Sequence, residues 1–235
     1  MSNAEQFLNH FNEIERWLKS TTGYQNHLSF IEMLHQCKER NAIVRRFFDD
    51  LHQFASLRNA IVHTRRNNRP IAEPYDETVK ALESIKNELL RPPLVPKTPN
   101  VFVVRQETEL EHLLVAIKNY DYSQVPVLDN ENKVIEVINT NTIARWLSEK
   151  TVDDIISLKE TFVKDLLPHI EHSNNYKLIS RTINLYEAAS IFQKTSSVNK
   201  HNLDAILITE NGHNSERLIG ILCLEDLAEY FLKEN

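Results

Sequence analysis

The stretch LIGILCLEDL, residues 218–227, decides the fold. An apolar run around a glycine predicts a strand over 217–223, and LEDLAEYFL (224–232) then has apolar residues at helical spacing. Upstream, LDAILIT (203–209) has the pattern of a buried strand, and the ENGHNSE between the two strands is rich in turn residues. The end of the chain therefore predicts a strand, a turn, a second strand and a helix.

The same order of elements occurs twice after residue 100, which predicts an internal repeat of β-α-β-β-α units. Between the two copies lies a connecting segment, residues 151–175, in which VDDIISL and FVKDLL have helical patterns. The first copy comprises strands 101–104, 123–129 and 133–139 with helices 109–120 and 140–147, and the second adds strand 176–180 and helix 184–194 before residue 203.

The first 91 residues predict helices that pack as a four-helix bundle. Only one glycine, Gly23, occurs there, and Pro74 stands where a last helix can begin. A third helix is expected from about Asn41 to His63. The other three apolar stripes comprise Phe7, Phe11, Ile14 and Leu18; Leu28, Ile31, Leu34 and Cys37; and Val79, Leu82, Ile85 and Leu89.

The segment RPPLVPKTPN (91–100) has four prolines in ten residues, and such density favours extended chain. The fold class predicted is therefore α followed by α/β. The predicted domain boundaries are a helical domain 1–91, a linker 92–100, a first repeat 101–150, the connecting segment 151–175 and a second repeat 176–235.

Charge differs between the two halves of this 235-residue chain, whose net charge is −6. Residues 1–91 hold 13 Lys and Arg against 12 Asp and Glu, and the remainder holds 14 against 21. The helical part therefore tolerates a polyanion better than the second part. The chain has no apolar run of about 18 residues, and its start, MSNAEQFLNHFNEIERW, has no signal-peptide core. With two distant cysteines and no metal-ligand spacing, a cytoplasmic protein is expected.

Two motifs of the repeat resemble those of CBS domains, named for cystathionine β-synthase. SQVPVLD resembles their Ser-x-x-Pro-Val-x-Asp strand, and LIGILCLEDL resembles their closing Gly-x-x-Thr/Ser-x-x-Asp signature. The resemblance implies a tandem CBS pair, or Bateman module, that binds an adenine nucleotide such as AMP, ADP or ATP as a regulatory ligand. No required cofactor and no metal are expected.

The CBS resemblance also implies which residues would bind the nucleotide. Gly220 and Asp226 match the signature, with Asp226 expected to accept hydrogen bonds from the ribose hydroxyls, while Cys223 replaces the hydroxyl residue. Ser123 lies on the strand expected to line the ligand. An alternative role for Asp226 is to complement the dipole of the last helix. In the first repeat the matching positions hold Glu136, Asn139 and Thr142, so that site is expected to bind no ribose.

The helical part contains Arg58, Asn59 and His63, spaced as Arg-Asn-x-x-x-His. This resembles the signature of HEPN domains, helical bundles that often act as metal-independent ribonucleases. The resemblance casts His63 as general acid or base, Arg58 as the cation that stabilises the phosphorus centre, and Asn59 as an orienting residue. Nearby arginines would hold the RNA backbone: Arg65, Arg66 and Arg69.

Structural roles for the same residues remain open. Arg58 falls on the apolar stripe of its predicted helix, so it could pair with a carboxylate such as Glu32, Asp49 or Asp50. His63 could simply end the helix. Three hypotheses follow: a nucleotide-regulated ribonuclease, a non-catalytic sensor or adaptor whose helical part docks a partner, and a structural oligomer with a degenerate CBS pair. A homodimer without a membrane span is expected.

Overall fold

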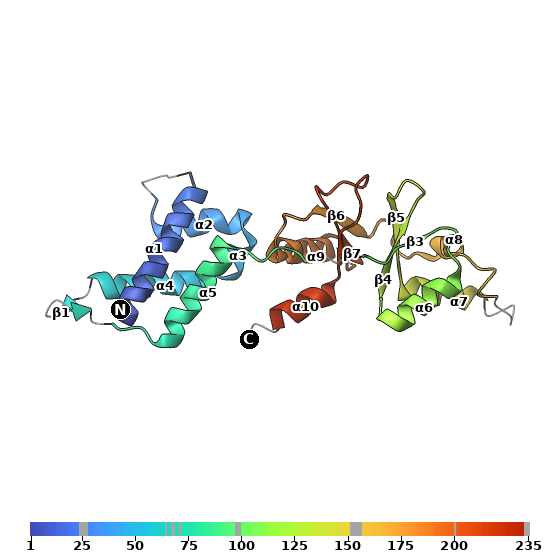
Figure 1. The fold of residues 1–235 in the computed structure, drawn as a ribbon. Coiled ribbons are helices and arrows are strands. Elements are labelled where there is room, and N and C mark those ends of the chain that lie inside the picture. Colours follow the sequence, from blue (N-terminus) through green and yellow to red (C-terminus); the bar gives the residue numbers. More distant parts are fainter. Residues whose placement is uncertain are drawn as a thin grey trace. The chain divides into compact units, whose positions relative to one another are not determined.

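The computed structural model describes residues 1–23, 28–63, 65–66, 69–70, 72–96, 100–150, 157–199 and 201–232, without the side chains of 63, 65–66, 69–70, 197–199 and 229–232. The chain divides into two compact units, Met1–Pro93 and Leu94–Asn235, which are described separately (Figure 1). The predicted helix VDDIISL (152–158) falls almost wholly outside the described residues.

The first unit is helical, as expected. Two of its helices begin with a capping box, in which Ser2 pairs with Glu5 and Ser29 pairs with Glu32. Each box satisfies backbone N–H groups that the first helical turn leaves free. The elements are α1 (Asn3–Thr21), α2 (Phe30–Arg40), α3 (Ala42–Arg46), α4 (Phe48–His63), the short hairpin β1 (Arg65–Arg66) and β2 (Arg69–Pro70), and α5 (Asp76–Leu90).

The core of the first unit is built around α1, which packs against α2, α4 and α5. The rings of Phe11 and Phe30 stack with centroids 4.4 Å apart, and Phe7 meets Phe54 edge to face. The predicted stripes of the first and last helices are confirmed, because all their members are buried: Phe7, Phe11, Ile14 and Leu18, and Val79, Leu82, Ile85 and Leu89.

The predicted continuous helix from Asn41 to His63 is wrong, because the chain breaks at Phe47 into α3 and α4. Phe47 has φ −97° and ψ 19°, which lies outside helical geometry. The side chain of Asn41 caps the short helix by accepting from two backbone N–H groups. After the break, Phe48 contacts α2, where its ring lies 4.9 Å from that of His35 and 4.0 Å from Nζ of Lys38. These contacts favour the break over a straight helix.

The second unit consists of two three-stranded sheets with helices, and the predicted β-α-β-β-α repeat is confirmed. In each sheet the first two strands pair in parallel and the last two are antiparallel. The first repeat comprises β3 (Val104–Arg105), α6 (Leu110–Tyr120), β4 (Gln124–Leu128), β5 (Val134–Asn139) and α7 (Thr140–Lys150), and the second comprises α8 (Val163–Leu166), a 3-10 turn (Leu167–His169), β6 (Tyr176–Ser180), α9 (Leu185–Asn199), β7 (Ala205–Thr209), β8 (Gly220–Leu222) and α10 (Leu224–Leu232).

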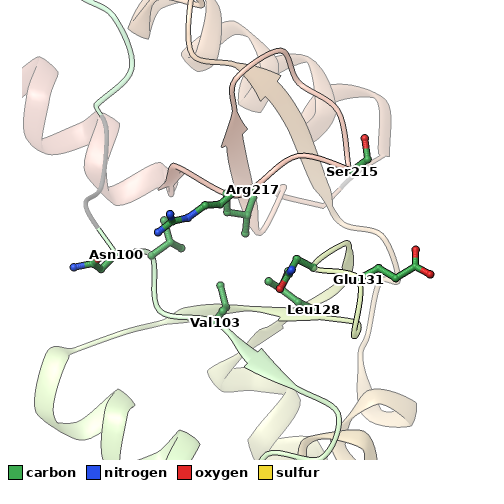
Figure 2. Close-up of a pocket in the computed structure, with 9 residues that line it drawn as sticks. Asn100, Val103, Leu128, Glu131, Ser215 and Arg217 are labelled. Atoms are coloured by element: carbon green, nitrogen blue, oxygen red, sulfur yellow. The ribbon is translucent and has the colours of Figure 1, made fainter.

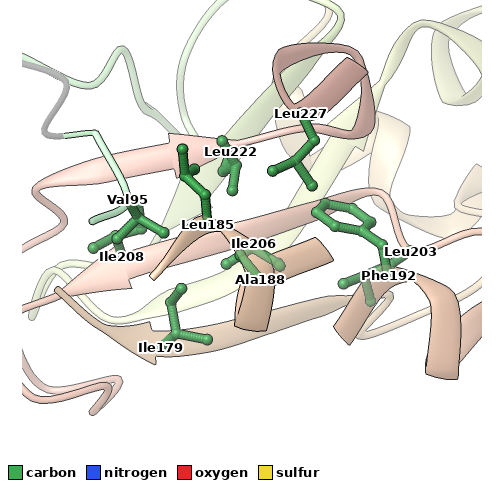
Figure 3. Packing of buried hydrophobic residues seen from close by; sticks show 10 residues of the cluster. All are labelled: Val95, Ile179, Leu185, Ala188, Phe192, Leu203, Ile206, Ile208, Leu222 and Leu227. Carbon is green, nitrogen blue, oxygen red and sulfur yellow. The ribbon is translucent and has the colours of Figure 1, made fainter. Parts of the chain in front are cut away.

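The two sheets share a core. Leu128, Val134 and Val137 of the first sheet form one buried cluster with residues of the second repeat, Ala205, Leu207 and Leu218. The helices of the second repeat cover the other side of its sheet, and Figure 3 shows that cluster. β7 is buried along its whole length because apolar contacts lie on both of its faces.

The segment that leads into each repeat packs in the core of the other repeat. The backbone N–H of Val95, ahead of the first repeat, donates to the carbonyl of Ile183 at 3.2 Å, and Val95 lies in the core of the second repeat (Figure 3). The N–H of Val163, ahead of the second sheet, donates to the carbonyl of Thr108 at 2.9 Å, and Val163 lies in the core of the first repeat. Neither repeat has a complete core alone, so we expect the pair to fold as one unit.

Candidate ligand sites

Gly220 is the first residue of β8, and its lack of a side chain allows neighbouring atoms to pack closely against it. A Cβ at this position would lie 2.9 Å from Cδ1 of Ile208 and 3.1 Å from the carbonyl oxygen of Pro96. The second contact is with backbone, which cannot move aside easily. The signature glycine therefore lets the entering segment of the first repeat cross close over β8.

Asp226 lies in the first turn of α10 and is exposed. Its Oδ2 accepts a hydrogen bond from the backbone N–H of Cys223 at 2.7 Å. This is the helix-start role that the sequence left open as an alternative. A carboxylate has about four acceptor positions, so one backbone bond leaves capacity for further donors.

Cys223 and Ser123 both hydrogen-bond to Gln124, which no motif in the sequence marks. The thiol of Cys223 donates to Oε1 of Gln124 at 3.1 Å, and the hydroxyl of Ser123 donates to the same oxygen. Burial, and then the charges of Asp226, Glu225 and Asp204, raise the pKa of the Cys223 thiol to about 12. The thiol is therefore a neutral donor and a poor nucleophile.

The first repeat has a different arrangement at the matching positions. Oδ1 of Asn139 accepts from the backbone N–H of Thr142 at 2.8 Å and from its hydroxyl at 3.0 Å, and Thr142 is buried. Glu136, where the second repeat has glycine, is buried and accepts from the N–H of Asn174 at 2.8 Å. No signature carboxylate faces solvent at this position, because a buried threonine takes its place.

A pocket of about 410 Å³ lies elsewhere in the second unit (Figure 2). It opens between the turn that joins β4 to β5 and the loop that precedes β8. None of the predicted ligand residues lines it, and its wall could not be foreseen because it combines segments far apart in sequence. The lining comprises Asn100, Val101, Val103, Leu128, Glu131, Asn132, Ser215, Arg217 and Leu218.

In the first unit, Arg58 and Asn59 lie together near the end of α4. Nη1 of Arg58 donates to Oδ1 of Asn59 at 3.3 Å, and the guanidinium lies 6.0 Å from the ring of Phe11. The buried Nε of Arg58 has no protein hydrogen-bond partner. Within the described part of the chain, no carboxylate lies within ion-pair distance of Arg58, so the pairing with Asp49, Asp50 or Glu32 weighed from sequence is absent. Both residues border a hollow of about 230 Å³.

The remaining predicted residues of the first unit are placed only by their backbone. His63 is the last residue of α4, four positions after Asn59. Arg65, Arg66 and Arg69 lie in the β1–β2 hairpin, where a polar loop had been expected. Their side chains, like that of His63, fall outside the described residues, so the predicted catalytic and RNA-contacting geometry remains a prediction.

Comparison with known proteins gives the family. The model of the CBS domain matches residues 95–149 and 163–233, which together make up more than half of the chain. The protein therefore belongs to the CBS-domain family, with two copies in tandem. No curated protein matches the chain.

Similar solved structures each cover part of the chain. They include CBSX2 in complex with AMP, at 20% identity, 59% coverage of this chain, 93% coverage of that chain and a TM-score of 0.40. A CBS domain pair solved with 5-methylthioadenosine and S-adenosyl-L-methionine, from protein MJ0100, has 13% identity, coverages of 61% and 100%, and a TM-score of 0.41. The CBS domain of the bacterial CNNM/CorC family Mg²⁺ transporter with ATP has 18% identity, coverages of 58% and 83%, and a TM-score of 0.38.

The described residues contain no group of three or more His, Cys, Asp or Glu side chains placed to hold a metal ion. None of the helices in this part of the chain is long and apolar enough to cross a membrane.

Proposed function

We propose that this protein is a regulator whose CBS pair binds an adenine nucleotide where β8 and α10 meet β4. The observation that carries the proposal is the exposed carboxylate of Asp226 at the signature position, beside the Cys223–Gln124–Ser123 chain of hydrogen bonds. The ribose hydroxyls would donate to Asp226, and Ser123 supplies a polar group on the neighbouring strand. With Thr142 buried in the first repeat, one nucleotide per chain is expected.

Asp226→Asn tests this site, measured by isothermal titration with AMP, ADP, ATP and S-adenosylmethionine. The amide can still accept from the N–H of Cys223, so the helix cap survives while the charge is lost. Affinity should fall about tenfold or more, since each tenfold is about 1.4 kcal/mol. Asp165→Asn is the matched control, because Asp165 caps α8 through the same kind of bond, to the N–H of Phe162 at 2.9 Å. Equal losses in both variants would contradict the proposal.

The helical unit would act as the regulated part, and a metal-independent ribonuclease is the activity that its motif favours. One observation supports this choice: Arg58 keeps a half-buried guanidinium at a hollow beside Asn59, with no carboxylate partner among the residues that the structure describes. A cation held in this way is available to a phosphate. Regulation requires that the nucleotide bind the active and inactive arrangements with different affinity, with coupling through the linker 92–100 and the interface of a homodimer.

The nuclease is tested by cleavage of labelled total RNA in EDTA, with wild type, His63→Ala and Arg58→Lys, each with and without millimolar ATP or AMP. Cleavage by wild type that both variants lose, and that nucleotide changes, is the expected result. RNA that stays intact throughout would leave the other candidate, a non-catalytic sensor or adaptor. Light scattering after gel filtration would show whether the chain is a dimer.

A further inference from the structure

The pocket between the β4–β5 turn and the loop before β8 combines an apolar wall with polar groups. The apolar wall belongs to the shared core of the two repeats, with Val103, Leu128 and Leu218. Figure 2 shows the side chain of Arg217 extending towards Asn100 at one end of the pocket, whereas Ser215 lies at the other end. A ligand that fills this space must itself have an apolar body and a polar head.

The charge at the pocket is positive. Among the described residues, Arg217 has no ion-pair or hydrogen-bond partner, and it is exposed. The carboxylate of Glu131, the acidic group of the lining, is bound to Nζ of Lys133 at 2.7 Å. An uncompensated guanidinium therefore faces the ligand space, and such a group binds carboxylates and phosphates with paired N–H donors.

The amide of Asn132 adds a donor. Its Oδ1 accepts from Nη2 of Arg105 at 2.7 Å, and another N–H of Arg105 donates to the carbonyl of Asp129. Since the oxygen is engaged by Arg105, the NH₂ group of the amide is the part that remains for a ligand. Asn132 has φ 64°, a left-handed conformation that fixes the turn presenting it.

Hydrogen bonds within the protein fix the two loops that form the walls of the pocket. Asn214 joins the two loops, because its Oδ1 accepts from the N–H of Val134 at 2.7 Å and its Nδ2 donates to the carbonyl of the same residue at 3.1 Å. Glu216 holds the second loop by accepting from the backbone and side-chain N–H groups of Asn211, each at 2.7 Å. Binding to a preformed site avoids the cost of ordering loops.

We propose that this pocket is a second effector site, which binds a small organic anion: a carboxylate or phosphate group on an apolar body. The head group contacts Arg217 and Asn132, and the body lies on Val103, Leu128 and Leu218. Because the lining comes from both repeats, the ligand braces them against each other. The site is separate from the proposed nucleotide site, because Arg217 and Leu218 precede β8 whereas Cys223 and Asp226 follow it.

Methyl NMR of the full chain tests the proposal with probes that share a body and differ in charge. Phenyl phosphate, benzyl alcohol and benzylamine are titrated into protein labelled at Leu and Val methyls. The expected result is shifts at Val103, Leu128 and Leu218, with phenyl phosphate at least about fivefold tighter than benzyl alcohol, and benzylamine weakest. Inorganic phosphate alone should bind more weakly than phenyl phosphate, because it has no apolar body.

Two substitutions complete the test. Arg217→Gln should weaken phenyl phosphate about fivefold and remove the preference over benzyl alcohol. Arg181→Gln should change neither, because Arg181 is a partly exposed arginine outside the lining that pairs with Glu210 at 2.8 Å. Asp226→Asn should leave phenyl phosphate binding intact, so the two proposals can fail separately. Shifts confined to other methyls, equal affinity for all three probes, or an unchanged affinity in Arg217→Gln would overturn the proposal.

Discussion

The thiol of Cys223 donates to Oε1 of Gln124 at 3.1 Å, and this bond joins the end of β8 to the start of β4. In the first repeat Asn139 stands where the second has Cys223, and its Nδ2 donates to Oδ1 of Asp204 at 3.0 Å. Asp204 directly precedes β7 and matches Ser123, so the two repeats contact each other in a similar way but one residue apart in register. In each contact a signature residue at the end of one sheet's last strand meets the beginning of the other sheet's middle strand.

Gln124→Ala should lower the free energy of unfolding of the second unit by about 1 kcal/mol. The change removes the acceptor of both the Cys223 thiol and the Ser123 hydroxyl. Urea unfolding can be followed by the fluorescence of Trp146, which lies in the core of the first repeat, in a Trp17→Phe background. Gln193→Ala, an exposed glutamine on α9, is the control and should change stability by less than about 0.5 kcal/mol.

Gly220→Ala should destabilise the second unit by about 1–3 kcal/mol, the usual cost of overpacking. The new methyl group would lie 3.1 Å from the carbonyl oxygen of Pro96 and 2.9 Å from Ile208. The same Trp146 fluorescence measures the change. A neutral substitution would mean that the entering segment can move away from β8 at little cost, and that the close crossing is not needed for the fold.

Cys223 should resist alkylation. At pH 8 a thiol with a pKa of about 12 is almost wholly protonated, and the thiolate is the reactive form. In a Cys37→Ala variant, iodoacetamide should react at least about 100-fold more slowly with the folded chain than with the chain in urea, where the pKa is about 8.5. A folded rate within tenfold of the unfolded one would show that the thiol is exposed or ionised.

Much of this fold could be predicted from sequence because local periodicity reflects burial. The stripes of α1 and α5, and the order of strands and helices in both repeats, follow from which residues avoid water. The break at Phe47 could not be foreseen, because nothing in the local pattern shows that Phe48 would contact Lys38 and His35 of another helix.

The candidate site was predicted less completely, because a sequence motif identifies a residue but not the residues that it contacts in the fold. The signature selected Cys223 and Asp226, but their contacts lie with Gln124 and Asp204, which depend on how the two sheets pack. Aligning the two repeats with each other matches Ser123 to Asp204 and Gln124 to Ala205, so it could have selected Asp204 but not Gln124. The pocket with Arg217 has no such signal, because its wall is made by two turns that the chain separates widely.

Glu216 should make stability depend on pH in the acid range. Hydrogen bonds from the side chain and then the backbone of Asn211 lower the pKa of this carboxyl from 4.5 to about 2. A lowered carboxyl pKa stabilises the fold above the ordinary value, and that contribution is lost as pH falls from about 4.5 towards 2. The stability difference between wild type and Glu216→Gln should therefore be constant above about pH 5 and shrink below pH 4.5. Glu210→Gln, in the same loop, controls for the loss of one charge, and a difference that grew on acidification would contradict the assignment.

If Arg58 serves to bind a ligand, its presence should lower the free energy of unfolding of the first unit when no ligand is bound. Its buried Nε has no protein partner, and a polar group left in this state costs about 1–3 kcal/mol. Methionine has a similar length and no polar hydrogen, so Arg58→Met should leave unfolding of the unit unchanged or raise its free energy by about 1 kcal/mol. Urea unfolding followed by Trp17 fluorescence in a Trp146→Phe background measures this, with Arg16→Met, an exposed arginine on α1, as control. A loss of more than about 1 kcal/mol would instead show that the contacts of Arg58 with Asn59 and Phe11 hold the bundle together, a structural role different from the carboxylate pairing considered from sequence.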